Sequence, residues 1–95
     1  MGPTCEVVLP AIIDESSLDA IDAILDRVSE IIERTRKGRS WELVVDGRPI
    51  SVAIADSNTI GLAASCNAPE DYSILGRIGR EMADLLGGEA SVPSK

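Results

Sequence analysis

Histidine and phenylalanine are both absent from this chain of 95 residues, and Trp41 and Tyr72 are its only aromatic residues. Without histidine, the chain cannot form the usual catalytic triads, a histidine general base or most kinds of catalytic zinc site. With so few aromatics, the core must consist mainly of isoleucine, leucine, valine and alanine. We therefore predict a protein that is not an enzyme and that holds no metal or other cofactor.

Positive charge is also scarce, because 9 Lys and Arg residues stand against 16 Asp and Glu residues, and the net charge is −7. Such a surface repels nucleic-acid backbones and attracts basic proteins. No hydrophobic run approaches the roughly 20 residues of a membrane span. The first residues also lack a basic stretch followed by an apolar segment. We expect a cytoplasmic protein that binds neither nucleic acid nor membranes.

Cysteine is limited to Cys5 and Cys66, which are far apart and fit no metal-ligand spacing. In a cytoplasmic protein we expect both thiols to be reduced and buried. A disulfide between them stays open as an alternative if their strands lie side by side.

A long helix is predicted over residues 16–37. Ser16 is suited to cap its start, with Asp19 at the third helical position, and Gly38 is suited to end it. The last turn would hold three cations, which suit the helix dipole: Arg34, Arg36 and Lys37.

Five acidic residues of this predicted helix fall on one side, within an arc of roughly 80°. We call them the acid line: Asp19, Asp22, Asp26, Glu30 and Glu33. Apolar residues occupy the opposite side: Leu18, Ile21, Ile24, Leu25, Val28, Ile31 and Ile32. The acid line is our candidate surface for a basic protein partner, whose association it would accelerate; the alternative is a solvated face. As a cation site, helical acids spread over several turns form a poor cage.

A three-stranded antiparallel meander is predicted over residues 41–65. Asp46-Gly47 is a strong two-residue hairpin signal between residues 41–45 and 48–55. Pairing across it sets Leu43 opposite Ile50 and Trp41 opposite Val52. A three-residue loop over 56–58 sets Ile54 opposite Ile60 and Val52 opposite Leu62, which keeps one face apolar.

The two faces of this predicted sheet differ in side-chain size. One face carries the large residues, which the helices should cover: Trp41, Leu43, Ile50, Val52, Ile54, Ile60 and Leu62. The other carries Val44, Pro49 and small residues: Ser51, Ala53, Ala55, Gly61, Ala63 and Ser65. Two interpretations of this second face remain: it is exposed to solvent, or it binds another subunit or a partner.

The flanking segments complete the predicted fold. Residues 5–9 form a first strand that ends at Pro10, beside either the second or the fourth strand. A second helix begins at the cap residue Asn67, with Glu70 at the third helical position. Its buried stripe is Leu75, Ile78, Met82, Leu85 and Leu86. Gly76, Gly79 and Ala83 form a smooth seam for close packing against the first helix or a partner. Gly87-Gly88 ends it.

The predicted fold is a two-layer α+β sandwich in the order β-α-β-β-β-α, with both helices on one face of the sheet. Residues 1–88 form the single domain, and residues 89–95 form a loose tail.

The chain begins with MGPTCEVVLP, and residues 66–88 read CNAPEDYSILGRIGREMADLLGG. These two stretches resemble a family of uncharacterised small bacterial proteins grouped with toxin-immunity proteins. The family often has a longer middle and a short strand after the double glycine, and residues 89–95 look unlike that strand. The resemblance implies a non-enzymatic inhibitor held against a cognate toxin, often a basic nuclease.

Our leading hypothesis is therefore an acidic protein-binding module, of the immunity type, that blocks a basic protein. One alternative is a homo-oligomeric regulatory or small-molecule-binding domain, dimerised through the small-residue sheet face. Another is an acidic secretion-chaperone-like protein that dimerises and wraps an extended substrate segment.

Overall fold

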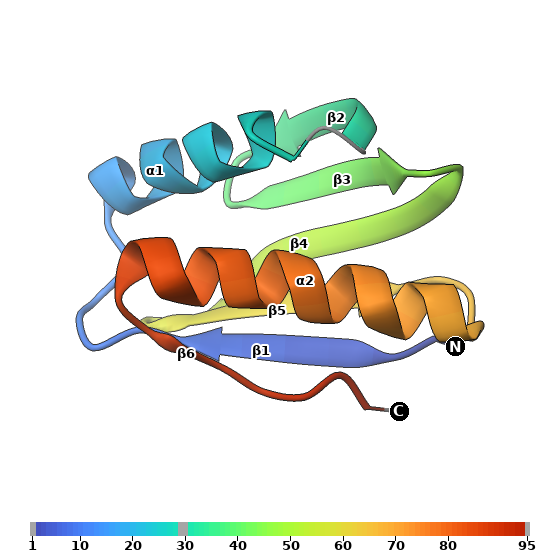
Figure 1. Cartoon of the computed structure of the whole chain (residues 1–95). Helices are drawn as coiled ribbons and strands as arrows, with labels where there is room; N and C mark the ends of the chain where they lie inside the picture. Colours follow the sequence, from blue (N-terminus) through green and yellow to red (C-terminus); the bar gives the residue numbers. More distant parts are fainter. Residues whose placement is uncertain (1, 29–30, 95) are drawn as a thin grey trace.

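The computed structural model describes residues 2–28 and 31–94, which form a sheet of six antiparallel strands with two helices on one face (Figure 1). The strands are β1 (Thr4–Val8), β2 (Ile31–Lys37), β3 (Ser40–Val45), β4 (Arg48–Asp56), β5 (Thr59–Ala64) and β6 (Glu89–Ala90). The helices are α1 (Glu15–Asp26) and α2 (Pro69–Leu86). The predicted α+β sandwich is confirmed, with β2 and β6 as additional strands.

The predicted helix over residues 16–37 is wrong in its second half. Helix α1 ends at Asp26, and residues 31–37 form β2, which pairs with β3. The helix is capped by Asp14 rather than Ser16, because the Asp14 carboxylate accepts the backbone N–H of Ser17 at 3.0 Å. The cations assigned to the last helical turn, Arg34, Arg36 and Lys37, lie instead on β2.

The hairpin between β3 and β4 is confirmed in type and register. Leu43 pairs with Ile50 and Trp41 with Val52, as predicted. The φ angles of Asp46 and Gly47 are 54° and 77°, and two positive angles in succession are typical of a type I′ turn. This turn follows the right-handed twist of the strands and therefore fixes the pairing.

The register between β4 and β5 is also confirmed, although the connection differs. Ile54 pairs with Ile60 and Val52 with Leu62, but the turn contains only residues 57–58. A bulge between Ile54 and Asp56 supplies the additional residue that the predicted three-residue loop contained. The large side chains therefore stay on one face.

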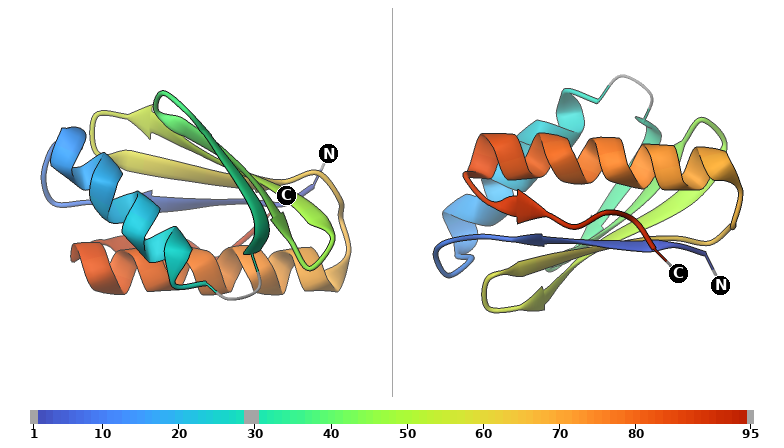
Figure 2. Two further views of the ribbon diagram at one scale, coloured as in Figure 1. Left: turned by 90° about the horizontal axis from the view of Figure 1, so that it is seen from above. Right: turned by 60° about the horizontal axis from the view of Figure 1, so that its bottom comes forward.

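Strand β1 lies beside β5. Of the two predicted positions for the first strand, the one beside the fourth predicted strand is therefore correct. The chain end is not a loose tail, because β6 pairs with β1 (Figure 2, right). The N–H of Ser91 donates to the carbonyl of Glu6 at 2.8 Å, and the N–H of Thr4 donates to that of Ser94 at 2.7 Å. These bonds satisfy backbone groups that an edge strand would leave open.

The start of α2 depends on a buried carboxylate. The helix is capped at Ala68 rather than Asn67, and Asp71 rather than Glu70 accepts the N–H of the cap residue, at 3.0 Å. The side chain of Asp71 is fully buried, and the Arg48 guanidinium donates to its Oδ2 at 2.9 Å. Its Oδ1 has no hydrogen-bond partner among the described residues. Arg48 therefore joins β4 to the start of α2.

The remainder of α2 packs largely as predicted, and its C-cap is Gly87, whose φ of 73° suits glycine. Leu75, Ile78 and Met82 are buried, whereas Leu85 is 47% exposed. The predicted seam packs against β1 rather than α1, since a Cβ at Gly79 would lie 2.9 Å from the sulfur of Cys5. Gly76 lies against Pro93 of the chain end.

The core lies between the helices and the sheet, and Figure 2 (left) shows both helices on the same side. The large-residue face is confirmed as the buried one, with Trp41, Leu43, Ile50, Val52, Ile60 and Leu62 each at most 2% exposed. Ile54 is only partly buried. We call the sheet face that neither helix covers the open face.

Candidate partner-binding surfaces

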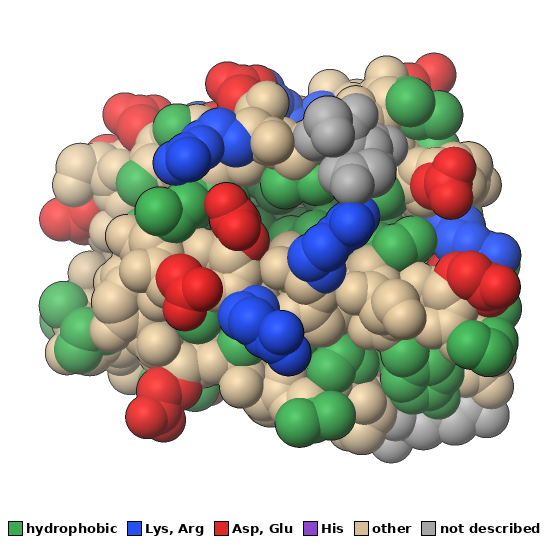
Figure 3. Space-filling view, in the orientation of Figure 1, with side chains coloured by type: hydrophobic (Ala, Val, Ile, Leu, Met, Phe, Trp, Pro, Cys, Tyr) green, Lys and Arg blue, Asp and Glu red, His purple; other side chains and the backbone are tan. Residues whose placement is uncertain are grey.

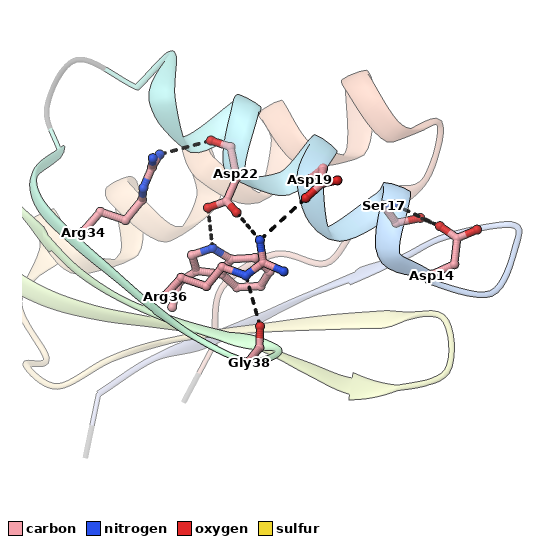
Figure 4. Close-up of polar contacts among 8 residues, drawn as sticks. Asp14, Ser17, Asp19, Asp22, Arg34, Arg36 and Gly38 are labelled. Carbon is pink, nitrogen blue, oxygen red and sulfur yellow. Dashed lines mark hydrogen bonds and ion pairs between the residues drawn. The ribbon is translucent and has the colours of Figure 1, made fainter.

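The acid line does not form a single stripe, because its members belong to two elements. Asp19, Asp22 and Asp26 lie on α1, and Glu33 lies on β2. Glu30 falls outside the described residues. The part of the line on α1 faces the two arginines of β2, so its carboxylates have cationic neighbours from the same chain (Figure 4).

Asp22 is the centre of this network. Its Oδ1 accepts the indole N–H of Trp41 at 2.8 Å, and its Oδ2 accepts from the Arg36 guanidinium at 2.5 Å. The Arg36 guanidinium also lies 5.5 Å from the centre of the Trp41 ring, within the range of a cation–π interaction. Asp22 therefore joins α1 to both β2 and the buried tryptophan.

The other two acids of α1 also face cations. Asp26 forms an ion pair with Arg34 at 2.5 Å, and the Arg34 guanidinium donates to the carbonyl of Asp22 at 3.1 Å. Asp19 lies 3.7 Å from Arg36, and its side chain is 81% exposed. Internal pairing lowers the charge that α1 offers a partner, so the geometry favours a structural role for Asp22 and Asp26. Their role in partner binding stays a prediction.

The arginines of β2 were misplaced because two periodicities overlap in residues 24–37. Ile24, Leu25, Val28, Ile31 and Ile32 match a helical stripe, which hid a change of period. From residue 33 onward, Arg34 and Arg36 alternate with Glu33, Thr35 and Lys37, so that the two arginines share one side of a strand. That alternation, together with the β-branched Thr35, is the sequence pattern that indicates a strand here.

Asp14 caps the start of α1. The Asp14 carboxylate accepts hydrogen bonds from the hydroxyl of Ser16 at 2.8 Å and from Ser17. These bonds lower the pKa of Asp14, with the Ser16 hydroxyl as the largest cause. The cap is thus strongest while Asp14 is ionised and weakens as the pH falls through its lowered pKa. Within residues 2–28 and 31–94, no three metal-ligating side chains gather as a metal site would require.

The open face carries the predicted small residues and is hollowed in its middle. We call this hollow the trough; its volume is about 340 Å³, and it is lined mainly by Ser51, Ala53, Ala55, Gly61 and Ala63. Neither helix covers it, and Ala53 and Ala55 are exposed. A row of small side chains bounded by taller neighbours can accept a ridge of larger apolar side chains from another molecule.

Acidic side chains stand on both sides of the trough. Glu6 of β1 lies across from Gly61, and Glu42 of β3 lies across from Ser51. The Ser51 hydroxyl donates to the Glu42 carboxylate at 3.0 Å, which holds that carboxylate beside the trough. The trough therefore combines an apolar floor with a negatively charged rim.

The outer side of α2 has a different character. Figure 3 shows acidic and basic side chains interspersed over this side of the molecule. The groove between α2 and the chain end is lined in part by Arg77, Arg80, Glu81 and Asp84. Charges of both signs lie close together there, whereas Glu6 and Glu42 beside the trough have the same sign.

The two thiols occupy different environments. Cys5 is buried in the core, and burial raises the pKa of its thiol, which donates to the carbonyl of Ser91 at 3.2 Å. Cys66 is exposed, so the prediction that both are buried is wrong for this residue. Both cysteines are free thiols.

None of the helices in the described residues is both long and apolar enough to cross a membrane. No protein-family model matches the chain, and no curated protein or solved structure matches it either.

Proposed function

We propose that the protein is a cytoplasmic, non-enzymatic binding module that holds a basic protein against the open face of its sheet. The observation that carries this proposal is the trough, an apolar hollow with Glu6 and Glu42 on its rim. A partner with protruding apolar side chains between lysines or arginines would fill the floor and neutralise the rim. An inhibitor of the immunity type, which the sequence resemblance implies, would act in this way by covering its target.

Charge supports the same kind of partner. The net charge of −7 attracts basic proteins over a distance that depends on ionic strength. The pairing of Asp22 and Asp26 with arginines leaves the open face as the better candidate for direct contact. Rim charges of this kind act mainly on the association rate and on partner selection.

The test is capture from a lysate of the native cells at low and high salt, followed by mass spectrometry. We expect the wild-type chain to retain a basic protein that elutes as salt rises. The double variant Glu6→Lys and Glu42→Lys should retain it at least tenfold less, because both rim charges are then repulsive. Asp84→Lys on α2 is the control away from the trough. Equal retention by the rim variant and the wild type would refute the proposal.

A further inference from the structure

Strand β2 is an edge strand of the sheet, and its outer side is open for pairing. It has seven residues, and the residues from Ile32 to Lys37 are exposed. In the part of the chain that the structure describes, no strand lies beyond it, whereas the other end of the sheet is closed by β6 and the chain end. An outer strand directs the N–H and C=O groups of alternate residues away from the sheet. Strand β2 is therefore long enough and accessible enough to accept another strand.

Two charged side chains of β2, Glu33 and Lys37, are available to pair with another molecule. Glu33 and Lys37 point to the open face, as do their pairing partners Val44 and Ser40. Neither forms an ion pair with any described residue. They are four residues apart on one strand, roughly 13 Å, which is too far for them to pair with each other.

We propose that two copies of the chain associate through β2, with the strands antiparallel and a two-fold axis at Thr35. In this arrangement Glu33 of each copy lies across from Lys37 of the other, so that two cross-strand ion pairs form. Cross-strand pairs of opposite charge stabilise a sheet. The self-complementary arrangement closes as a dimer, as two-fold interfaces do.

The opposite face of β2 is compatible with this register. Arg34 would lie across from Arg36 of the second copy, and like charges there would normally repel. Each guanidinium already forms an ion pair with an aspartate of α1, Asp26 for Arg34 and Asp22 for Arg36. A two-fold axis at Arg34 would instead oppose two copies of that arginine and leave Glu33 across from Thr35. The axis at Thr35 is therefore favoured.

This dimer would place the open faces of both copies on the same side of one continuous sheet, so that the two troughs share a surface. The association follows from β2 alone and does not depend on the proposed basic partner. A failure of one proposal therefore leaves the other standing.

The charge pairing is tested by sedimentation equilibrium of the purified chain over a range of concentrations. We expect the wild type to dimerise and Glu33→Lys or Lys37→Glu to raise the dissociation constant about tenfold, because two repulsive pairs replace two attractive ones. The double variant Glu33→Lys with Lys37→Glu should return to within about threefold of the wild type. A monomeric wild type, or single variants that dimerise as well as the wild type, would overturn the proposal.

The register is tested by disulfide cross-linking in a Cys66→Ser background, which removes the exposed thiol. Thr35→Cys should cross-link under mild oxidation, because residues directly opposite in an antiparallel pair lie within disulfide range. Glu33→Cys should not, because its two copies would lie roughly 13 Å apart. Equal cross-linking of both variants would contradict the axis at Thr35.

Discussion

Replacing Arg48 with methionine is expected to lower the free energy of unfolding by about 3 kcal/mol, as when one partner of a buried ion pair is removed. Asp71 is fully buried and, of its partners among the described residues, would keep only the N–H of Ala68. The Arg48 side chain is 28% exposed, so some water can reach the site and the loss falls at the lower end of the usual range. Unfolding in denaturant measures this loss of stability.

A matched control comes from the neighbouring acid. Glu70 lies 3.7 Å from the same guanidinium, but its side chain is 64% exposed. Glu70→Gln should therefore change the stability by less than about 0.5 kcal/mol, as exposed ion pairs contribute little. An effect of Arg48→Met as small as that of Glu70→Gln would show that the buried Asp71 carboxylate does not depend on Arg48.

Replacing Asp22 with alanine is expected to cost about 2 kcal/mol of stability, because the buried indole N–H of Trp41 loses its acceptor. The Arg36 guanidinium loses its closest carboxylate at the same time. Trp41 is the only tryptophan, so its emission reports directly on the site. We expect the emission to shift to longer wavelength as water reaches the indole nitrogen.

Asp19 provides the comparison on the same helix. It lies 3.7 Å from Arg36 with a side chain that is 81% exposed, so Asp19→Ala should cost less than about 0.5 kcal/mol and leave the emission unchanged. Equal effects of the two substitutions on stability and on emission would show that Asp22 has no special structural role among the acids of α1. A large effect of Asp22→Ala alone would show that this acid joins helix, sheet and core.

The central strands could be predicted because several local signals agree. The Asp46-Gly47 turn and the alternation of large and small residues define one register between β3 and β4, and the structure has it. A slip of one residue would turn every large side chain to the open face. The requirement that the large side chains share one face also predicted the correct pairing of Ile54 with Ile60. It could not distinguish a three-residue loop from a two-residue turn with a bulge.

The strand at residues 31–37 was missed for a physical reason. Isoleucines at 31 and 32 continue the helical stripe, and helical periodicity alone does not show where tertiary pairing becomes more favourable. In the structure, β2 pairs with β3 from Ile31 to Lys37, with a break in register at Ile32. Arg34 and Arg36 form ion pairs with acids of α1. The two-residue strand β6 is too short to leave any periodic pattern.

The candidate surface was predicted only in part. The small-residue face was recognised from alternation, and the structure leaves it uncovered and hollow. The acid line was not recognised as an internal network, because its partner arginines were assigned to the same helix. Asp71 was missed as well, since nothing local distinguishes it from Glu70 before the position of Arg48 on β4 is known.

The most direct test of the open face as the binding surface compares two variants in the same capture experiment. Ala53→Gln fills the trough without changing the charge, and Asp19→Lys reverses an exposed charge on α1. We predict that Ala53→Gln loses at least nine-tenths of the captured basic protein, whereas Asp19→Lys retains more than half. If Asp19→Lys lost the basic protein and Ala53→Gln retained it, the result would contradict a binding site on the open face and would place the binding site on α1.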